Sequence, residues 1–131
     1  MKHLLSVALA TLLSLPALAG EPNSPFSLRA EPLDARTILV RLDIPQGHAV
    51  YANKVQLELP SGWTLQSRTE PSVEDDPVAG REYLWRSRAE VVIVGPAGSA
   101  LPEAINVVLQ GCSEQAQICF PPERQRVPVG P

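Results

Sequence analysis

The chain has 131 residues, with 11 lysines and arginines against 14 aspartates and glutamates and a formal net charge of −3. It has no basic cluster, so nucleic acid is not expected as a partner. The 14 prolines argue against long helices, and the length suits one domain with one core.

The N-terminus has the layout of a secretory signal peptide. A short basic start containing Lys2 precedes an apolar run over residues 4–15 and the small-residue site Ala17-Leu18-Ala19. The run is too short for a permanent membrane span, and a buried N-terminal helix is the lesser alternative. We therefore predict a signal peptide over residues 1–19 and one mature domain over residues 20–131, outside the cytoplasm, where disulfides persist.

The mature region has the pattern of short strands separated by turns. Apolar and polar residues alternate over residues 38–44 and 55–59, and Pro- and Gly-containing turns end both runs. Trp63 and Trp85 are expected to be core or sheet-surface residues. Strands of this length and spacing predict an all-β fold, an antiparallel β-sandwich. The further expected strands are residues 63–67, 83–88 and 90–94 (one broken strand or two), 105–110 and 127–129.

Cys112 and Cys119 are the only cysteines, and six residues separate them. A disulfide between them closes a short loop and stabilises the fold by only about 2–2.5 kcal/mol in the loop-closure model. Facing residues on paired strands suit a disulfide, so a hairpin would place both sulfurs at the rim of the sandwich. Two interpretations remain open: a structural clip, or a bond that is made and broken.

The segment around the cysteines resembles a known family. Its residues are Gln110-Gly111-Cys112 and Ile118-Cys119-Phe120-Pro121-Pro122-Glu123, and they resemble the active-site segment of the N-terminal periplasmic domain of the DsbD thiol:disulfide interchange proteins. Weaker matches lie upstream in the same order. They are a tyrosine-containing strand at residues 51–55 after a turn at 47–50, a Leu-Pro-x-Gly turn at 59–62, and a strand at 82–86 that follows the family's cap loop.

The resemblance implies an immunoglobulin-like sandwich with a reversible cysteine pair on a hairpin at its rim. It implies thiol–disulfide exchange, of the protein-disulfide reductase type, with thioredoxin-fold periplasmic proteins such as disulfide isomerases or cytochrome c maturation thioredoxins. In the family scheme Cys119 forms the mixed disulfide and Cys112 resolves it. No cofactor beyond the dithiol is expected. Because the chain ends at Pro131, we expect a membrane reductase to act in trans. The alternative is a non-catalytic periplasmic binding module with a structural disulfide.

The chain departs from the family pattern around the cysteines. The family usually has five intervening residues where this chain has six, and the stretch matching its cap loop, residues 74–80, lacks the usual aromatic. Val78 is the nearest substitute for that aromatic.

Five residues are expected to surround the cysteine pair: Tyr51, Asp75, Asp76, Val78 and Phe120. Tyr51 either donates a hydrogen bond to the pair or only packs. Asp75 and Asp76 either raise the cysteine pKa values, as Glu114 would, or form a solvated loop. His48 and the cysteines lack metal-site spacing, so no metal is expected.

Overall fold

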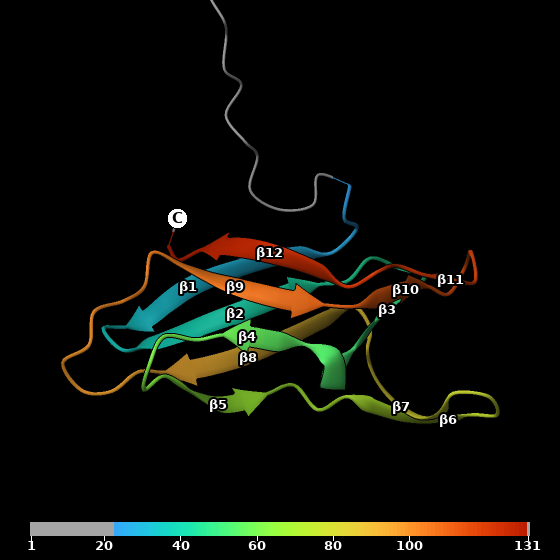
Figure 1. The fold of residues 1–131 in the computed structure, drawn as a ribbon, viewed down its shortest axis with the longest axis horizontal. Helices are drawn as coiled ribbons and strands as arrows, with labels where there is room; N and C mark the ends of the chain where they lie inside the picture. Colours follow the sequence, from blue (N-terminus) through green and yellow to red (C-terminus); the bar gives the residue numbers. More distant parts are fainter. Residues whose placement is uncertain (1–22, 131) are drawn as a thin grey trace, which may run out of the picture.

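The computed structural model describes residues 23–130, so the predicted signal peptide at residues 1–19 lies outside the described part. Residues 23–130 form an antiparallel β-sandwich (Figure 1). One layer has the order β1-β2-β8-β5. Its strands are β1 (Ser27–Asp34), β2 (Thr37–Asp43), β8 (Arg88–Val94) and β5 (Thr64–Arg68). The facing layer has the order β12-β9-β4, with β12 (Glu123–Pro128), β9 (Ala104–Leu109) and β4 (Gln56–Glu58).

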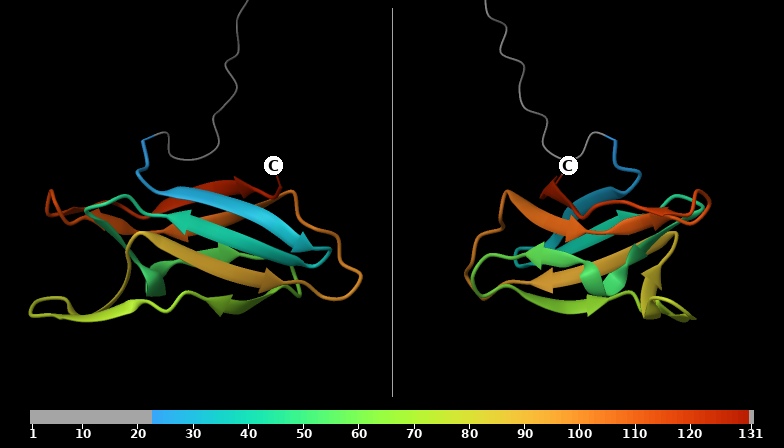
Figure 2. Two further views of the ribbon diagram at one scale, coloured as in Figure 1. Left: turned by 180° about the vertical axis from the view of Figure 1, so that it is seen from behind. Right: turned by 45° about the vertical axis from the view of Figure 1, so that its right-hand side comes forward.

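A third sheet extends from one end of the sandwich and carries the cysteines. Its order is β11-β10-β3-β7-β6. The strands are β11 (Ile118–Cys119), β10 (Gly111–Ser113), β3 (His48–Tyr51), β7 (Gly80–Trp85) and β6 (Ser72–Asp76). Two hairpins, β10–β11 and β6–β7, therefore project from the same end of the molecule (Figure 2).

The core lies between the four-stranded and three-stranded layers and follows from strand alternation. On β2 the inward residues Ile38, Val40 and Leu42 are buried, as the alternating pattern predicts. Trp63 and Trp85 are also buried, and the indole N–H of Trp85 donates to the Thr69 carbonyl at 2.9 Å. The neighbouring strand β8 contributes Ala89, Val91 and Ile93, and the facing strands β9 and β12 contribute Ile105, Val107, Leu109 and Val127. Within residues 23–130, no helix has the length and apolar character needed to cross a membrane.

The sequence predictions hold for most strands and fail at identifiable places. Of the two interpretations of residues 83–94, the two-strand one is confirmed, because β7 and β8 belong to different sheets and are separated at Ser87, whose φ is 67°. The strand expected over residues 51–55 is wrong, because β3 ends at Tyr51 and Ala52–Lys54 is a 3-10 helix. Strands β1 and β6 were not predicted, since Pro32 interrupts the pattern of β1 and every residue of β6 is exposed.

Candidate active site

The cysteines form a disulfide across the β10–β11 hairpin. Cys112 and Cys119 face each other directly in the strand register, and the Phe120 N–H donates to the Gly111 carbonyl at 2.9 Å next to them. The cysteines therefore occupy a non-hydrogen-bonded pair, the position in which facing side chains approach most closely. Residues 114–117 form the turn, so the extra residue of this chain is accommodated outside the strand pairing.

The two cysteines differ in exposure because of their places in the sheet. Cys112 is on β10, which pairs with β3 on one side and β11 on the other, and it is half-buried. Cys119 is on β11, the edge strand of the sheet, and it is exposed. An incoming thiolate therefore has easier access to Cys119 than to Cys112.

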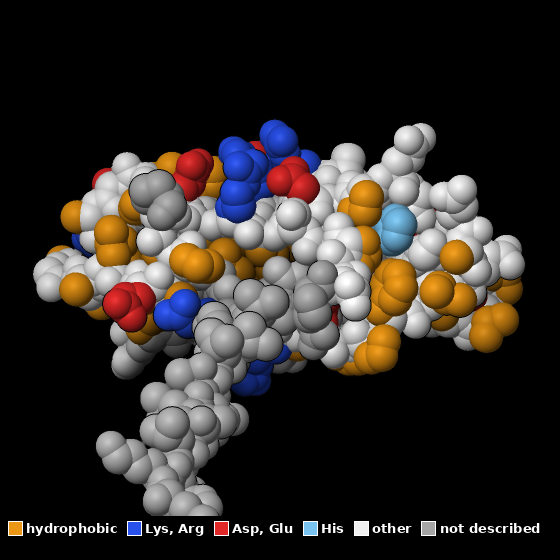
Figure 3. Space-filling model, turned by 90° about the horizontal axis from the view of Figure 1, so that it is seen from above, with side chains coloured by type: hydrophobic (Ala, Val, Ile, Leu, Met, Phe, Trp, Pro, Cys, Tyr) orange, Lys and Arg blue, Asp and Glu red, His pale blue; other side chains and the backbone are white. Residues whose placement is uncertain are grey.

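The hairpin rests on an aromatic cluster of Phe26, His48 and Phe120. Phe120 and His48 are stacked with ring centroids 6.2 Å apart, and buried Phe26 contacts both rings edge-on. Gly111 makes this possible, because a Cβ there would overlap the Phe26 ring. Hydrophobic side chains gather around the histidine at this end of the molecule (Figure 3). The structure thus places Phe120, one of the residues expected around the cysteine pair, in this cluster.

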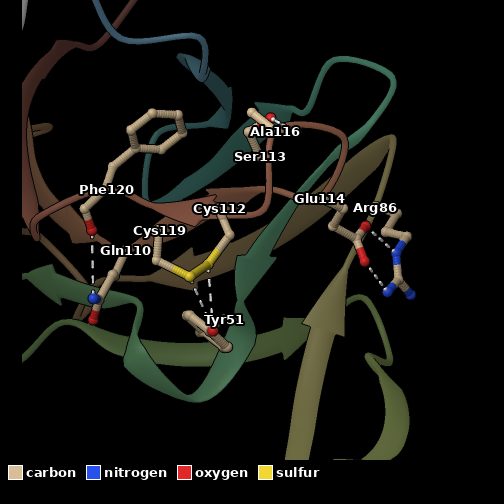
Figure 4. The surroundings of a disulfide bond; sticks show 9 residues. All are labelled: Tyr51, Arg86, Gln110, Cys112, Ser113, Glu114, Ala116, Cys119 and Phe120. Atoms are coloured by element: carbon tan, nitrogen blue, oxygen red, sulfur yellow. Dashed lines mark hydrogen bonds and ion pairs between the residues drawn. A yellow bond between two sulfur atoms is a disulfide. The ribbon is translucent and has the colours of Figure 1, made fainter.

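Tyr51 lies on the other side of the disulfide and points at both sulfurs (Figure 4). Its hydroxyl is 3.3 Å from Cys112 Sγ and 3.5 Å from Cys119 Sγ. Neither disulfide sulfur carries a hydrogen, so the hydroxyl is the donor in both contacts. Of the two interpretations of Tyr51 from the sequence, the hydrogen bond to the pair is the one that the structure shows.

The disulfide and Tyr51 line a shallow hollow of about 290 Å³ with acidic walls. Burial raises the pKa of Tyr51 above its ordinary value, and the charges of Glu82, Asp76 and Glu114 act in the same direction. The tyrosine therefore stays protonated and keeps its donor. The remaining lining residues are Ala49, Leu84, Ser113, Gln117 and Ile118.

The stretch matched to the cap loop is a β-hairpin rather than a loop folded over the cysteines. Asp76 accepts hydrogen bonds from the backbone N–H groups of Val78 and Ala79, both at 2.8 Å, and these bonds lower its pKa. This turn leaves Val78 at 96% exposure, so Val78 does not cover the disulfide. Asp75 pairs with Arg81 at 3.3 Å and is outside the hollow, whereas Asp76 lines it.

Glu114 has a partner that the sequence did not indicate. Both its carboxylate oxygens accept from Arg86 at 2.8 Å, and these hydrogen bonds lower the pKa of Glu114. Glu114 therefore lines the hollow as a member of an ion pair, and Arg86 compensates its charge. In the part of the chain that the structure describes, no group of three His, Cys, Asp or Glu residues is placed to hold a metal ion.

The geometry is that of a cross-strand cysteine pair at the edge of a β-sandwich, and the sequence match identifies its family. The family model for the N-terminal domain of the thiol:disulfide interchange protein DsbD matches residues 16–131. The chain belongs to this family. The family is named for thiol:disulfide interchange, a reaction carried out by cysteine pairs.

Two solved structures share the immunoglobulin-like fold of the DsbD N-terminal domain. One is the reduced DsbD N-terminal domain of Neisseria meningitidis, with 21% identity, a TM-score of 0.57, and coverage of 85% of this chain and 90% of that chain. The other is the complex between the DsbD and PilB N-terminal domains of Neisseria meningitidis, with 22% identity, a TM-score of 0.62, and coverage of 82% and 84%. No curated protein matches the chain significantly in sequence.

Three residues of the site were missed from the sequence: Glu82, Arg86 and Phe26. Alternation along β7 puts Glu82 on the same face as Leu84, and Leu84 is paired with Tyr51. Knowledge that β3 pairs with β7 would therefore have placed Glu82 near Tyr51. Phe26 precedes the first recognisable strand. Its role is visible only when Gly111 and His48 are brought beside it.

Proposed function

We propose that this domain exchanges its Cys112–Cys119 disulfide with the dithiols of thioredoxin-fold proteins in the periplasm. The observation that carries the proposal is the exposed edge position of Cys119, joined to a half-buried Cys112 with the Tyr51 hydroxyl on both sulfurs. The structural neighbour in which a DsbD N-terminal domain binds the PilB N-terminal domain supports a protein partner for this chain. In this proposal the electron donor is a membrane reductase, and the acceptors are of the disulfide isomerase or cytochrome c maturation type.

The reaction proceeds through a mixed disulfide on Cys119. A partner thiolate attacks Cys119 Sγ, the bond to Cys112 breaks, and its electron pair leaves on Cys112 Sγ as a thiolate. The Tyr51 hydroxyl, 3.3 Å from Cys112 Sγ, donates to the sulfur on which this charge develops. The partner's second thiolate then attacks the partner sulfur of the mixed disulfide, and Cys119 leaves as a thiolate. The domain gains two electrons and the partner becomes oxidised.

The reverse direction uses the same atoms. The Cys119 thiolate attacks a partner disulfide, and the Cys112 thiolate then attacks Cys119 Sγ and releases the reduced partner. No cofactor enters either direction, because each bond broken is replaced by another sulfur–sulfur bond.

Trapping of the mixed disulfide tests the proposal and the order of the cysteines. A thioredoxin-fold partner that keeps one active-site cysteine, activated with thionitrobenzoate, is mixed with reduced variants. We expect Cys112→Ala to form a stable adduct through Cys119 and Cys119→Ala to form little. If Cys119→Ala traps the partner equally well, the assigned order is wrong.

A second experiment separates exchange from a structural disulfide. We expect the potential of the pair to lie above roughly −300 mV, the region below which structural disulfides are found. The native domain and the variant lacking both cysteines are compared for electron transfer from reduced thioredoxin. Equal transfer by the two proteins refutes the proposed function.

A further inference from the structure

Arg86 lies next to the disulfide hollow without lining it, and it contacts both hairpins that project from this end. It follows the last residue of β7. Its Nε and Nη2 atoms donate to the two carboxylate oxygens of Glu114, each at 2.8 Å (Figure 4). Its Nη1 donates to Glu74 Oε2 at 2.5 Å. One guanidinium therefore joins the turn of the cysteine hairpin to β6.

The bidentate geometry makes this contact more specific than an ordinary surface ion pair. Two parallel N–H···O bonds fix the carboxylate of Glu114 relative to the guanidinium plane. The same turn is held from the other side by the Gly47 carbonyl, which accepts from the backbone N–H of Glu114 at 2.8 Å and of Gln115 at 3.3 Å. None of these contacts involves a sulfur atom, so reduction of the disulfide leaves them in place.

The charges that face the hollow make Arg86 important for the cysteines. Tyr51, whose hydroxyl contacts both sulfurs, is under the combined influence of the negative charges of Glu82, Asp76 and Glu114. Within residues 23–130, Glu114 is the one of these carboxylates that forms an ion pair. Without Arg86, a third uncompensated carboxylate would therefore face a site in which thiolates must form.

We propose that Arg86 is a positioning residue for thiol–disulfide exchange, which neutralises Glu114 beside the cysteine pair and fixes the cysteine turn against β6. The inference rests on the proposed function of the pair. Loss of the cation leaves negative charge next to the thiols, and a nearby negative charge disfavours the thiolate. The thiolate is the nucleophile in exchange, so its fraction at neutral pH sets the reaction rate.

The test is the pH profile of iodoacetamide alkylation of the reduced domain. Arg86→Gln is expected to shift the profile to higher pH and to slow alkylation at pH 7 by about two- to fivefold. Glu114→Gln should shift the profile in the opposite direction. The double variant Arg86→Gln/Glu114→Gln, in which both charges are absent, should return close to the native profile. A loss of folding alone would produce no such reversal.

Arg81 provides the matched control. It belongs to the same β6–β7 hairpin and pairs with Asp75, outside the hollow, so Arg81→Gln removes the same charge without touching the cysteine hairpin. The inference is overturned if Arg86→Gln and Arg81→Gln have equal alkylation profiles. It is also overturned if the profile of Arg86→Gln/Glu114→Gln stays shifted from the native one. If Arg86→Gln does not fold, Glu114→Gln tests the inference by itself: a shift of its alkylation profile to lower pH supports the inference, and no shift or a shift to higher pH overturns it.

The experiment also separates this inference from the proposed function. Alkylation reports on the thiols alone and needs no partner protein. Exchange of the native domain with reduced thioredoxin is measured in parallel. Absence of that exchange refutes the proposed function, while the alkylation profiles still decide the role of Arg86.

Discussion

Gly111→Ala tests whether the aromatic cluster beneath the cysteine hairpin depends on the absence of a side chain. Gly111 is buried at the start of β10, immediately before Cys112. A Cβ at this position would overlap Phe26 Cζ and would lie 2.6 Å from Phe26 Cε2 and 2.8 Å from the Ala49 carbonyl oxygen. Carbon atoms in unstrained contact are about 3.5–4.0 Å apart, so the Phe26 ring must move by about 1 Å or more.

The expected cost is at the upper end of the range for overpacked cores. The Ala49 carbonyl belongs to the backbone of β3, where Ala49 is paired with Cys112 in the register, so it cannot retreat without disturbing the sheet. Phe26 cannot move without displacing His48 and Phe120. We therefore expect a loss of about 2–4 kcal/mol in the free energy of unfolding. This corresponds to a fall in Tm of roughly 10–20 °C for a domain of this size.

Thermal unfolding followed by circular dichroism measures this loss, with Gly98→Ala as the matched control. Gly98 has a φ of +80°, and a Cβ added there would meet nothing within 4 Å, so the control carries backbone strain without a clash. It should cost about 1 kcal/mol. A second variant, Phe26→Leu/Gly111→Ala, should recover part of the stability because leucine leaves room for the methyl group. If Gly111→Ala unfolds at the native temperature, the steric reasoning is refuted.

Three further predictions concern the same end of the molecule. Tyr51→Phe removes the donor to both sulfurs, so alkylation of the reduced domain at fixed pH should slow about three- to tenfold; an unchanged rate would show that the tyrosine only packs. Reduction with dithiothreitol should lower the free energy of unfolding in urea by about 2–2.5 kcal/mol and leave the sheet intact, whereas complete unfolding would contradict the short-loop estimate. Because Arg86 lowers the pKa of Glu114 below its ordinary value of 4.5, the pair stabilises the fold above that pH, and the stabilisation is lost as the pH falls through the folded-state pKa. Glu114→Gln should abolish this part of the acid dependence, which amounts to less than about 1 kcal/mol because the pair is partly exposed. If the urea midpoints of the native protein and the variant fall equally between pH 6 and pH 3, the prediction is wrong.

The strands that the sequence predicted well are those with one buried face. Ile38, Val40 and Leu42 stand at every second position of β2 and are buried as expected. The cysteine hairpin was also predictable, because two cysteines separated by a short polar stretch can pair across adjacent strands. Local alternation and local spacing are properties of the sequence itself, so they can be recognised without knowledge of the fold.

The predictions that failed concern segments whose own hydrophobic pattern does not show their structure. Strand β6 has no buried residue and is held by its pairing with β7, so no periodicity in its own sequence reveals it. Val78 was expected near the disulfide on the basis of position. The turn formed by Asp76 directs that part of the chain into solvent. Strand pairing decided the first outcome, and the hydrogen bonds of a turn decided the second.

An antiparallel sandwich with a cysteine pair on a hairpin could be predicted from the residues alone, because hydrophobic alternation and the short spacing of the cysteines are local. The surroundings of that pair depend on the folded chain. It brought the Tyr51 hydroxyl onto the sulfurs from β3, and it placed Arg86, which is 28 residues from Glu114 in sequence, on both carboxylate oxygens. Such contacts depend on the register between strands that are far apart in the chain, and this register is fixed by the packing of the whole core.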